Sequence, residues 1–217
     1  MYKTVVFDLD GTLLNTLTDL ADAGNRLCRK YGWPTHERQA YRYFVGNGIP
    51  KLVERLAPAD QRTPAVLEAA LADFKRDYGQ HLRDTTAPYP GIPERLAKLK
   101  ANGVQLAVFS NKADALAKEV VKDYFGTQYF TIVRGQMTGV APKPAAEGTN
   151  ALLQALHADP ASTLYVGDSN VDVETAHNAN LPCCGAVWGF RTREELNAAG
   201  AEYLAENSDE LYDVIMK

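Results

Sequence analysis

Residues 4–12 of the chain read Thr4-Val5-Val6-Phe7-Asp8-Leu9-Asp10-Gly11-Thr12. The first four are apolar or β-branched without alternation, which is typical of a strand buried on both faces of a parallel sheet. Similar runs recur at residues 104–109, 130–133, 163–166 and 185–188, and helix-like stretches occupy residues 93–102, 113–124, 144–157 and 171–178. Strands that alternate with helices predict parallel βαβ units, and therefore an α/β fold with a doubly wound, mostly parallel sheet.

One long segment interrupts this alternation. From residue 15 to residue 86 the apolar side chains follow helical spacing, as Leu67, Ala70, Leu71 and Phe74 illustrate. The segment is far longer than a single crossover helix, and the Pro- and Gly-containing residues 85–91 that follow it are typical of a domain boundary. We therefore expect an α/β core domain made of residues 1–14 and 87–217, with an inserted helical cap domain made of residues 15–86.

The composition excludes several classes of protein. The chain has 217 residues, of which 46% are hydrophobic and 23% are charged, as in globular proteins. Its 23 Lys and Arg residues against 27 Asp and Glu residues give a net charge of −4. A chain with this balance lacks the broad positive field of proteins that bind nucleic acid or an anionic membrane. We expect no nucleic-acid partner and no membrane partner, whereas a small basic pocket for an anionic metabolite is compatible with the balance.

The N-terminus and the cysteines indicate a cytoplasmic protein. Asp8 and Asp10 interrupt the first apolar run, so no signal-peptide core forms. No apolar run approaches the ~20 residues that span a bilayer. The three cysteines, Cys28, Cys183 and Cys184, have the spacing of neither a disulfide framework nor a zinc site. The sequence is compatible with a monomer and with a homodimer.

Polar residues follow the predicted strands at the edge where ligands bind in doubly wound sheets. The four carboxylates among them, Asp8, Asp10, Asp168 and Asp172, would repel one another. A hard divalent cation bound between them would offset this repulsion. Mg²⁺ prefers oxygen ligands, and a substrate phosphate can complete its coordination shell. Lys143 adds a fixed positive charge and Ser110 a hydrogen-bond donor. A metal, a lysine and such donors together predict a site for a phosphoryl group in transfer.

An aspartate is the best candidate for a nucleophile. The chain contains no Gly-x-Ser-x-Gly and no Walker A pattern, and its four histidines are scattered. An aspartate can attack phosphorus and form an aspartyl phosphate, which water then hydrolyses. Taken singly, Asp168 could cap a helix and Lys143 could be a solvated loop residue. Asp8, however, closes a buried strand, where a carboxylate costs stability unless it is paired.

In their order along the chain these segments resemble the motifs of a known family. Asp8-Leu9-Asp10-Gly11-Thr12-Leu13, Ser110-Asn111, Lys143-Pro144 and Gly167-Asp168-Ser169-x-x-Asp172 look like the four ordered motifs of the haloacid dehalogenase-like phosphohydrolases. The resemblance covers essentially the whole chain, including a helical cap inserted after the first motif. Residues 45–48, 89–91 and 188–190 resemble the phosphoglycolate phosphatase branch of this family.

The resemblance implies a role for each matching residue. It implies that Asp8 is the nucleophile, and that Asp10 protonates the leaving alkoxide and then activates the hydrolytic water. It implies that Mg²⁺ is held by the Asp8 carboxylate, the Asp10 backbone carbonyl and Asp168, while Asp172 orients the metal shell from nearby.

The same resemblance implies the contacts with the substrate. Ser110 and Lys143 would hold the phosphoryl oxygens, and Thr12 and Asn111 would add further substrate contacts. In the cap, Asn47 between Gly46 and Gly48 could reach over the active site and select the substrate, or could equally be part of an interhelical turn.

We therefore expect a Mg²⁺-dependent phosphomonoesterase that acts on a small phosphorylated metabolite, with phosphoglycolate first among the candidates. A β-phosphoglucomutase-like enzyme, a pyrophosphatase or a nucleotidase of the same family would share the core motifs. A receiver-like phospho-aspartate signalling domain would lack the helical insertion, and a non-catalytic protein would not need the intact acidic residues. Asn15 and Arg191 depart from the residues usual in the family and, with Asn47 and Lys51, leave the substrate open.

Overall fold

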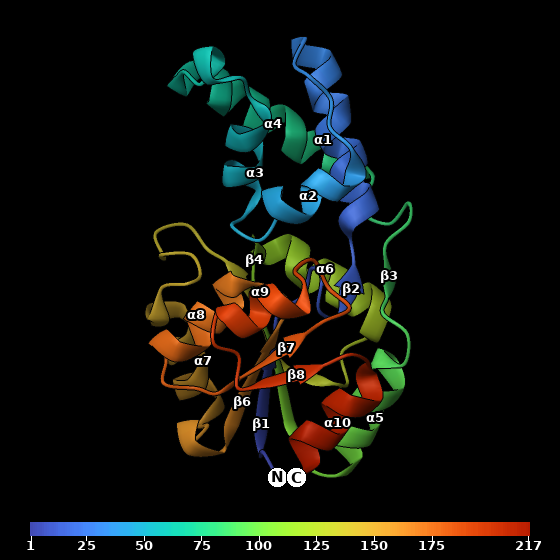
Figure 1. Cartoon of the computed structure of the whole chain (residues 1–217), viewed down its shortest axis with the longest axis vertical. Helices are drawn as coiled ribbons and strands as arrows, with labels where there is room; N and C mark the ends of the chain where they lie inside the picture. Colours follow the sequence, from blue (N-terminus) through green and yellow to red (C-terminus); the bar gives the residue numbers. More distant parts are fainter. The chain divides into compact units, whose positions relative to one another are not determined.

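The structure is a computed structural model that describes residues 1–217. The chain divides into two compact units (Figure 1), one made of Met1–Asn15 and Pro88–Lys217 and the other of Thr16–Ala87. The first unit contains the main sheet, and the second is helical. Two short strands, β2 (Leu14–Asn15) and β3 (Ala87–Pro88), pair where the chain passes from one unit to the other and back.

The first unit is built on a six-stranded sheet in the order β5-β4-β1-β6-β7-β8. Every pairing within it is parallel, which confirms the predicted α/β fold. Phe7, the last residue of the central strand, pairs with Val108 on one side and Val166 on the other. The strands are β1 (Thr4–Phe7), β4 (Gln105–Ala113), β5 (Phe130–Gln136), β6 (Thr163–Gly167), β7 (Cys183–Ala186) and β8 (Tyr203–Ala205).

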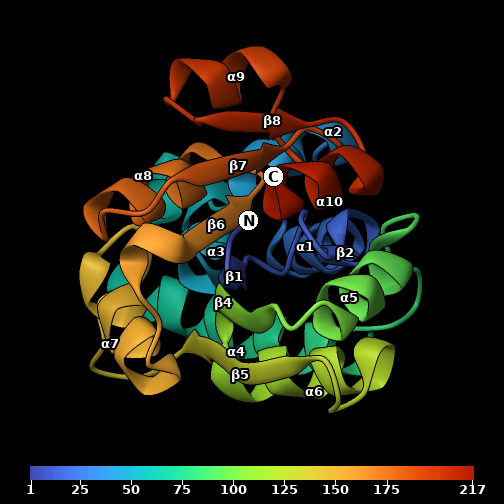
Figure 2. The same ribbon diagram turned by 90° about the horizontal axis from the view of Figure 1, so that it is seen from below.

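Helices cover both faces of this sheet (Figure 2). On one face Val6, Ala107 and Tyr165 belong to a continuous apolar cluster with Leu152 and Leu196 from the covering helices. The helices on this face are α7 (Ala146–Leu156), α8 (Asn170–Asn178) and α9 (Arg193–Ala198). The helices on the other face are α5 (Ile92–Ala101), α6 (Asp114–Phe125) and α10 (Ser208–Met216), and a short 3₁₀ helix, η2 (Pro160–Ser162), precedes β6.

The strand order creates a switch point at β1. The chain builds β4 and β5 on one side of β1 and then crosses to build β6, β7 and β8 on the other side. In open α/β sheets the ligand binds outside the carboxyl ends of the strands at such a point. The two termini lie side by side at the opposite edge (Figure 1), where the Tyr2 amide donates to the Ile215 carbonyl at 2.9 Å.

The second unit consists of four helices and one 3₁₀ turn. They are α1 (Leu17–Tyr31), α2 (Arg38–Phe44), α3 (Ile49–Leu56), η1 (Ala59–Gln61) and α4 (Pro64–Gln80). Its core includes Tyr41 and Phe74, and Gly24 leaves the space in which the Tyr41 ring packs, because a Cβ there would lie 2.5 Å from that ring. None of the helices in the structure has the length and apolar character needed to cross a bilayer.

Some elements differ from the expected boundaries. The strand expected at residues 185–188 is Cys183–Ala186, because its pairing with β6 begins at Tyr165 and Cys183. The helix expected from residue 144 begins at Ala146. The segment before it is held as a loop, since Asn111 bonds the backbone of Lys143 and Asn178 bonds the backbone of Pro144.

Candidate active site

Asp8 stands where β1 ends and the chain turns. Its amide donates to the Val166 carbonyl at 2.8 Å, which continues the pairing of β1 with β6. Gly11 then adopts a φ of +91°, and a Cβ at this position would lie 2.2 Å from Asp168 Oδ2. Because glycine tolerates both the positive φ and the close approach, it allows the turn to wrap around the carboxylate of Asp168.

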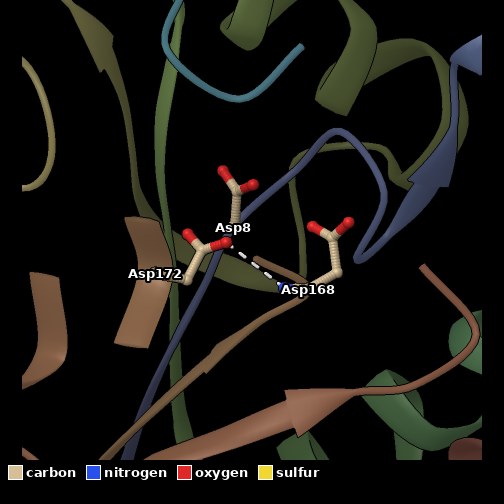
Figure 3. Close-up of side chains that lie close together, drawn as sticks. All are labelled: Asp8, Asp168 and Asp172. Atoms are coloured by element: carbon tan, nitrogen blue, oxygen red, sulfur yellow. Dashed lines mark hydrogen bonds between the residues drawn. The ribbon is translucent and has the colours of Figure 1, made fainter. Parts of the chain in front are cut away.

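Three carboxylates meet beside this turn (Figure 3). Asp8 follows β1, Asp168 follows β6 and Asp172 lies in the first turn of α8, and each is buried. One ligand atom from each residue lies within 4.8 Å of the others. The Asp172 Oδ2 accepts from the backbone amides of Asp168 and Ser169 at 3.2 and 3.1 Å, and from the Ser169 hydroxyl at 2.7 Å. Ser169, not Asp168, is the N-cap residue of this helix.

Lys143 joins two of these carboxylates. Its Nζ lies 2.8 Å from Asp8 Oδ1 and 2.7 Å from Asp172 Oδ1. It also donates to the Tyr165 hydroxyl at 3.1 Å and to the Phe109 carbonyl at 3.3 Å. Lys143 is buried, so the alternative of a solvated loop lysine is wrong. The ammonium is instead held at a defined point beside the end of β1.

Asp10 pairs with a different lysine, Lys112. Lys112 Nζ lies 3.1 Å from Asp10 Oδ1 and 3.4 Å from Oδ2. Lys112 and Ser110 both lie near the end of β4, where its pairing with β5 is irregular. The Ser110 hydroxyl is buried and accepts from the Lys112 amide at 3.2 Å.

The side chains expected to contact the substrate have defined partners. The Thr12 hydroxyl donates to Asp168 Oδ1 at 3.1 Å. The Asn111 side chain donates to the Lys143 carbonyl at 3.2 Å and accepts from the Lys143 amide at 2.9 Å. Asn47 lies between α2 and α3 of the helical unit, where its Oδ1 accepts from Arg55 at 2.8 Å. The contacts of Thr12 and Asn111 therefore support the acidic group and Lys143, and a substrate role for these residues stays a prediction.

Burial and like charge perturb the carboxylates. Burial raises the pKa of Asp8 to about 7 although Lys143 lowers it, and the charge of Asp172 adds to the rise. Burial and the charges of Asp172 and Asp8 raise the pKa of Asp168 well above its ordinary value. Burial lowers the pKa of Lys143, but the charges of Asp172 and Asp8 outweigh it, so the pKa lies well above the ordinary value.

These residues fit a hard divalent cation. Asp8 Oδ1 is buried and lies 2.8 Å from the Lys143 ammonium group, and no other group donates a hydrogen bond to it. It faces two further buried carboxylates with which it could share a cation. Oxygen donors of this kind are typical ligands of Mg²⁺, which also accepts phosphate oxygens into its shell.

The arrangement of strands and motifs matches a known family. The model of the haloacid dehalogenase-like hydrolases matches residues 5–186. The chain belongs to the haloacid dehalogenase-like hydrolase family. This confirms the resemblance seen in the four motifs.

Named relatives and solved structures agree with this assignment. The hydrolase is 31% identical over 191 residues to the phosphoglycolate phosphatase of Thiobacillus denitrificans, with 87% of this chain and 84% of the relative covered. It is 31% identical over 216 residues to that of Chromobacterium violaceum, with 98% and 96% covered. A crystal structure of a protein from Lactobacillus delbrueckii subsp. bulgaricus superposes with a TM-score of 0.93 at 28% identity, covering 99% of this chain and 98% of that one. The chain is thus a phosphoric monoester hydrolase of this family.

Sequence reasoning missed two polar residues of this hydrolase's site. Its place directly after Ser110-Asn111 could have drawn attention to Lys112, although nothing in the sequence indicates its pairing with Asp10. Tyr165 gave no such signal, because an aromatic residue in a buried strand is typical of a sheet core. Its hydroxyl reaches Lys143 because the structure brings β6 beside the loop that carries Lys143.

Proposed function

We propose that this hydrolase is a Mg²⁺-dependent phosphatase of a small organic phosphate, with 2-phosphoglycolate as the preferred substrate. The observation that carries the proposal is the group formed by Asp8, Asp168 and Asp172 with Lys143 at the end of β1. The named relatives support the choice of substrate, since those in Thiobacillus denitrificans and Chromobacterium violaceum are phosphoglycolate phosphatases.

The chain's own residues divide the reaction into two displacements. In the first, a carboxylate oxygen of Asp8 bonds to phosphorus while the bond to the ester oxygen breaks, and Asp10 gives its proton to that oxygen. In the second, Asp10 takes a proton from a water molecule that attacks the same phosphorus. Inorganic phosphate leaves, and the carboxylate of Asp8 is restored.

Other groups bind the phosphoryl oxygens and position the phosphoryl group for attack. Lys143 places a fixed positive charge 2.8 Å from Asp8, and Ser110 is buried on the neighbouring strand. Asp8, Asp168 and the backbone carbonyl of Asp10 would hold the Mg²⁺, with Asp172 orienting its shell. When bound, the cation neutralises charge on the phosphoryl group.

The test is turnover by the purified protein with Mg²⁺ on a panel of 2-phosphoglycolate, sugar phosphates, pyrophosphate and nucleotides. We expect release of inorganic phosphate, fastest from 2-phosphoglycolate, and loss of release in Asp8→Asn and after chelation of the metal. Transfer of the phosphoryl group back to a sugar phosphate would favour a phosphomutase. A substrate other than 2-phosphoglycolate, at a higher kcat/KM, would remove our first choice. Full activity of Asp8→Asn would remove the nucleophile.

A further inference from the structure

Lys112 is a buried cation to which the proposed mechanism gives no role. Its side chain is 2% exposed, and the Asp10 side chain that it pairs with is 15% exposed. Removing an ammonium group from water is expensive unless a well-placed counter-charge offsets it. Asp10 supplies such a counter-charge, because its Oδ1 lies 3.1 Å from the Lys112 ammonium group.

The backbone that carries Lys112 is held on both sides. Its amide donates to the Ser110 hydroxyl at 3.2 Å. On the neighbouring strand Gly135 leaves room for it, because a Cβ at Gly135 would lie 2.4 Å from the Lys112 carbonyl oxygen. The Gly135 amide also donates to Asp114 Oδ1 at 2.9 Å, just beyond Lys112. The backbone from which the Lys112 side chain extends is thus held in place near the end of β4.

The two buried lysines of the site serve different carboxylates. Lys143 contacts Asp8 and Asp172, whereas Lys112 contacts Asp10. The Lys112 ammonium group lies 3.1 and 3.4 Å from the two Asp10 oxygens, so a single cation contacts both atoms of the carboxyl group. A group that gives and takes protons must lie within hydrogen-bond reach of the reacting oxygen. The orientation of the Asp10 carboxyl group therefore affects the rate of catalysis.

We propose that Lys112 is the positioning residue of Asp10: its ammonium group fixes the Asp10 carboxyl group for proton transfer at the leaving oxygen and at the attacking water. The inference rests on the proposed function. It assigns Lys112 an action through Asp10 alone, without contact with the phosphoryl group. Two consequences follow from that restriction, and each can be measured.

The first consequence is that Lys112 contributes nothing when Asp10 cannot act. We expect Lys112→Met to lower kcat for 2-phosphoglycolate about 10²-fold, since a misplacement of about 1 Å can have that effect. In the Asp10→Asn background the same substitution should change kcat less than about 3-fold. Lys98→Met is the matched control, because Lys98 is an exposed lysine of α5 and should keep wild-type kcat.

The second consequence concerns the leaving group. Nitrophenolate leaves without a proton, so formation of the aspartyl phosphate from 4-nitrophenyl phosphate should be unchanged in Lys112→Met. Hydrolysis of that intermediate still needs Asp10 and should slow about 10²-fold. Stopped-flow absorbance should therefore show a burst of about one nitrophenolate for each active site, followed by slow turnover.

The outcomes separate the inference from the proposed function. Wild-type kcat in Lys112→Met, losses that multiply in the double variant, or no nitrophenolate burst would each overturn the role of Lys112. An inactive wild-type protein, or an active Asp8→Asn variant, would instead remove the proposed function. Circular dichroism checks folding, and if Lys112→Met does not fold, Lys112→Gln is used in the same comparisons because its amide retains a donor for Asp10.

Discussion

Replacing Asp8 by asparagine should abolish turnover and at the same time stabilise the metal-free protein. The two side chains have nearly the same shape, but only aspartate carries charge. Burial and the charge of Asp172 raise the pKa of Asp8 from its ordinary value of 3.8 to about 7, although Lys143 acts in the opposite direction. The folded protein therefore holds a proton on Asp8 more tightly than the unfolded chain does.

The sign and size of the effect follow from proton linkage. The pKa of Asp8 is higher in the folded protein than in the unfolded chain. Protonated Asp8 therefore makes its full contribution to the free energy of unfolding below about pH 4, and the wild-type protein loses this contribution as the pH rises to about 7. The two pKa values differ by about 3, which at ~1.36 kcal/mol for each unit corresponds to at most about 4 kcal/mol. Asparagine does not titrate, so the variant keeps this stability at pH 8. For a chain of this size the melting temperature should rise by roughly 10 °C.

The assay is thermal unfolding in EDTA at pH 4 and pH 8, with activity measured separately in Mg²⁺. The gap between Asp8→Asn and wild type should be large at pH 8 and small at pH 4. Asp213→Asn is the matched control, because Asp213 is exposed on α10 and its substitution should change stability by less than about 0.5 kcal/mol. Two results would refute the conclusion that ionised Asp8 destabilises the folded protein. One is a variant that is no more stable than wild type at pH 8, and the other is a difference in stability between the two proteins that does not depend on pH.

Two further substitutions test the surroundings of the acidic group. Gly189→Ala would place a Cβ 2.2 Å from the Asp168 Cβ, so we expect at least a 10-fold weaker response to Mg²⁺ in thermal-shift titrations. Gly79→Ala is its control, since a Cβ there meets nothing within 4 Å and alanine in this helix should add about 0.5–1 kcal/mol of stability. Tyr165→Phe removes one acceptor of Lys143, and we expect a loss of about 1–3 kcal/mol in denaturant unfolding with a several-fold lower kcat/KM. Unchanged stability and kinetics would contradict a role of this hydroxyl in holding the lysine.

The elements that sequence reasoning predicted correctly are those in which one local pattern decides the structure. The apolar and β-branched run at residues 4–7 favours a buried strand, and its predicted bounds, Thr4–Phe7, are those of β1. The edge strand β8 was missed because it has three residues and its first side chain, Tyr203, is partly exposed, so it shows neither a long apolar run nor a regular alternation. Strand β7 was displaced by two residues because pairing with β6, and not local hydrophobicity, sets where it begins.

In the candidate site, too, local sequence patterns predicted some features, whereas others depend on the assembled sheet. Asp8, Asp168 and Lys143 were proposed from their places after strands, and the structure brings them together with Asp172 at one sheet edge. The pairing of Lys112 with Asp10 spans 102 residues. It depends on how far β4 extends beyond its pairing with β1 and on the room that Gly135 leaves for its bulged end. Such facts depend on the assembled sheet, and no spacing in the sequence contains them.

The charges of the site explain how an acidic protein can bind an anion. The four carboxylates Asp8, Asp10, Asp168 and Asp172 carry −4 when ionised, and their ion pairs are with two lysines, which leaves −2. One bound divalent cation would bring the group to neutrality. A dianionic phosphate would then meet no net repulsion, yet it would find a metal and an ammonium group within reach of the nucleophile. Removing the cation restores the net repulsion of the substrate. By thermodynamic linkage, a bound cation should therefore raise the affinity for the substrate, and a bound substrate should raise the affinity for the cation by the same factor.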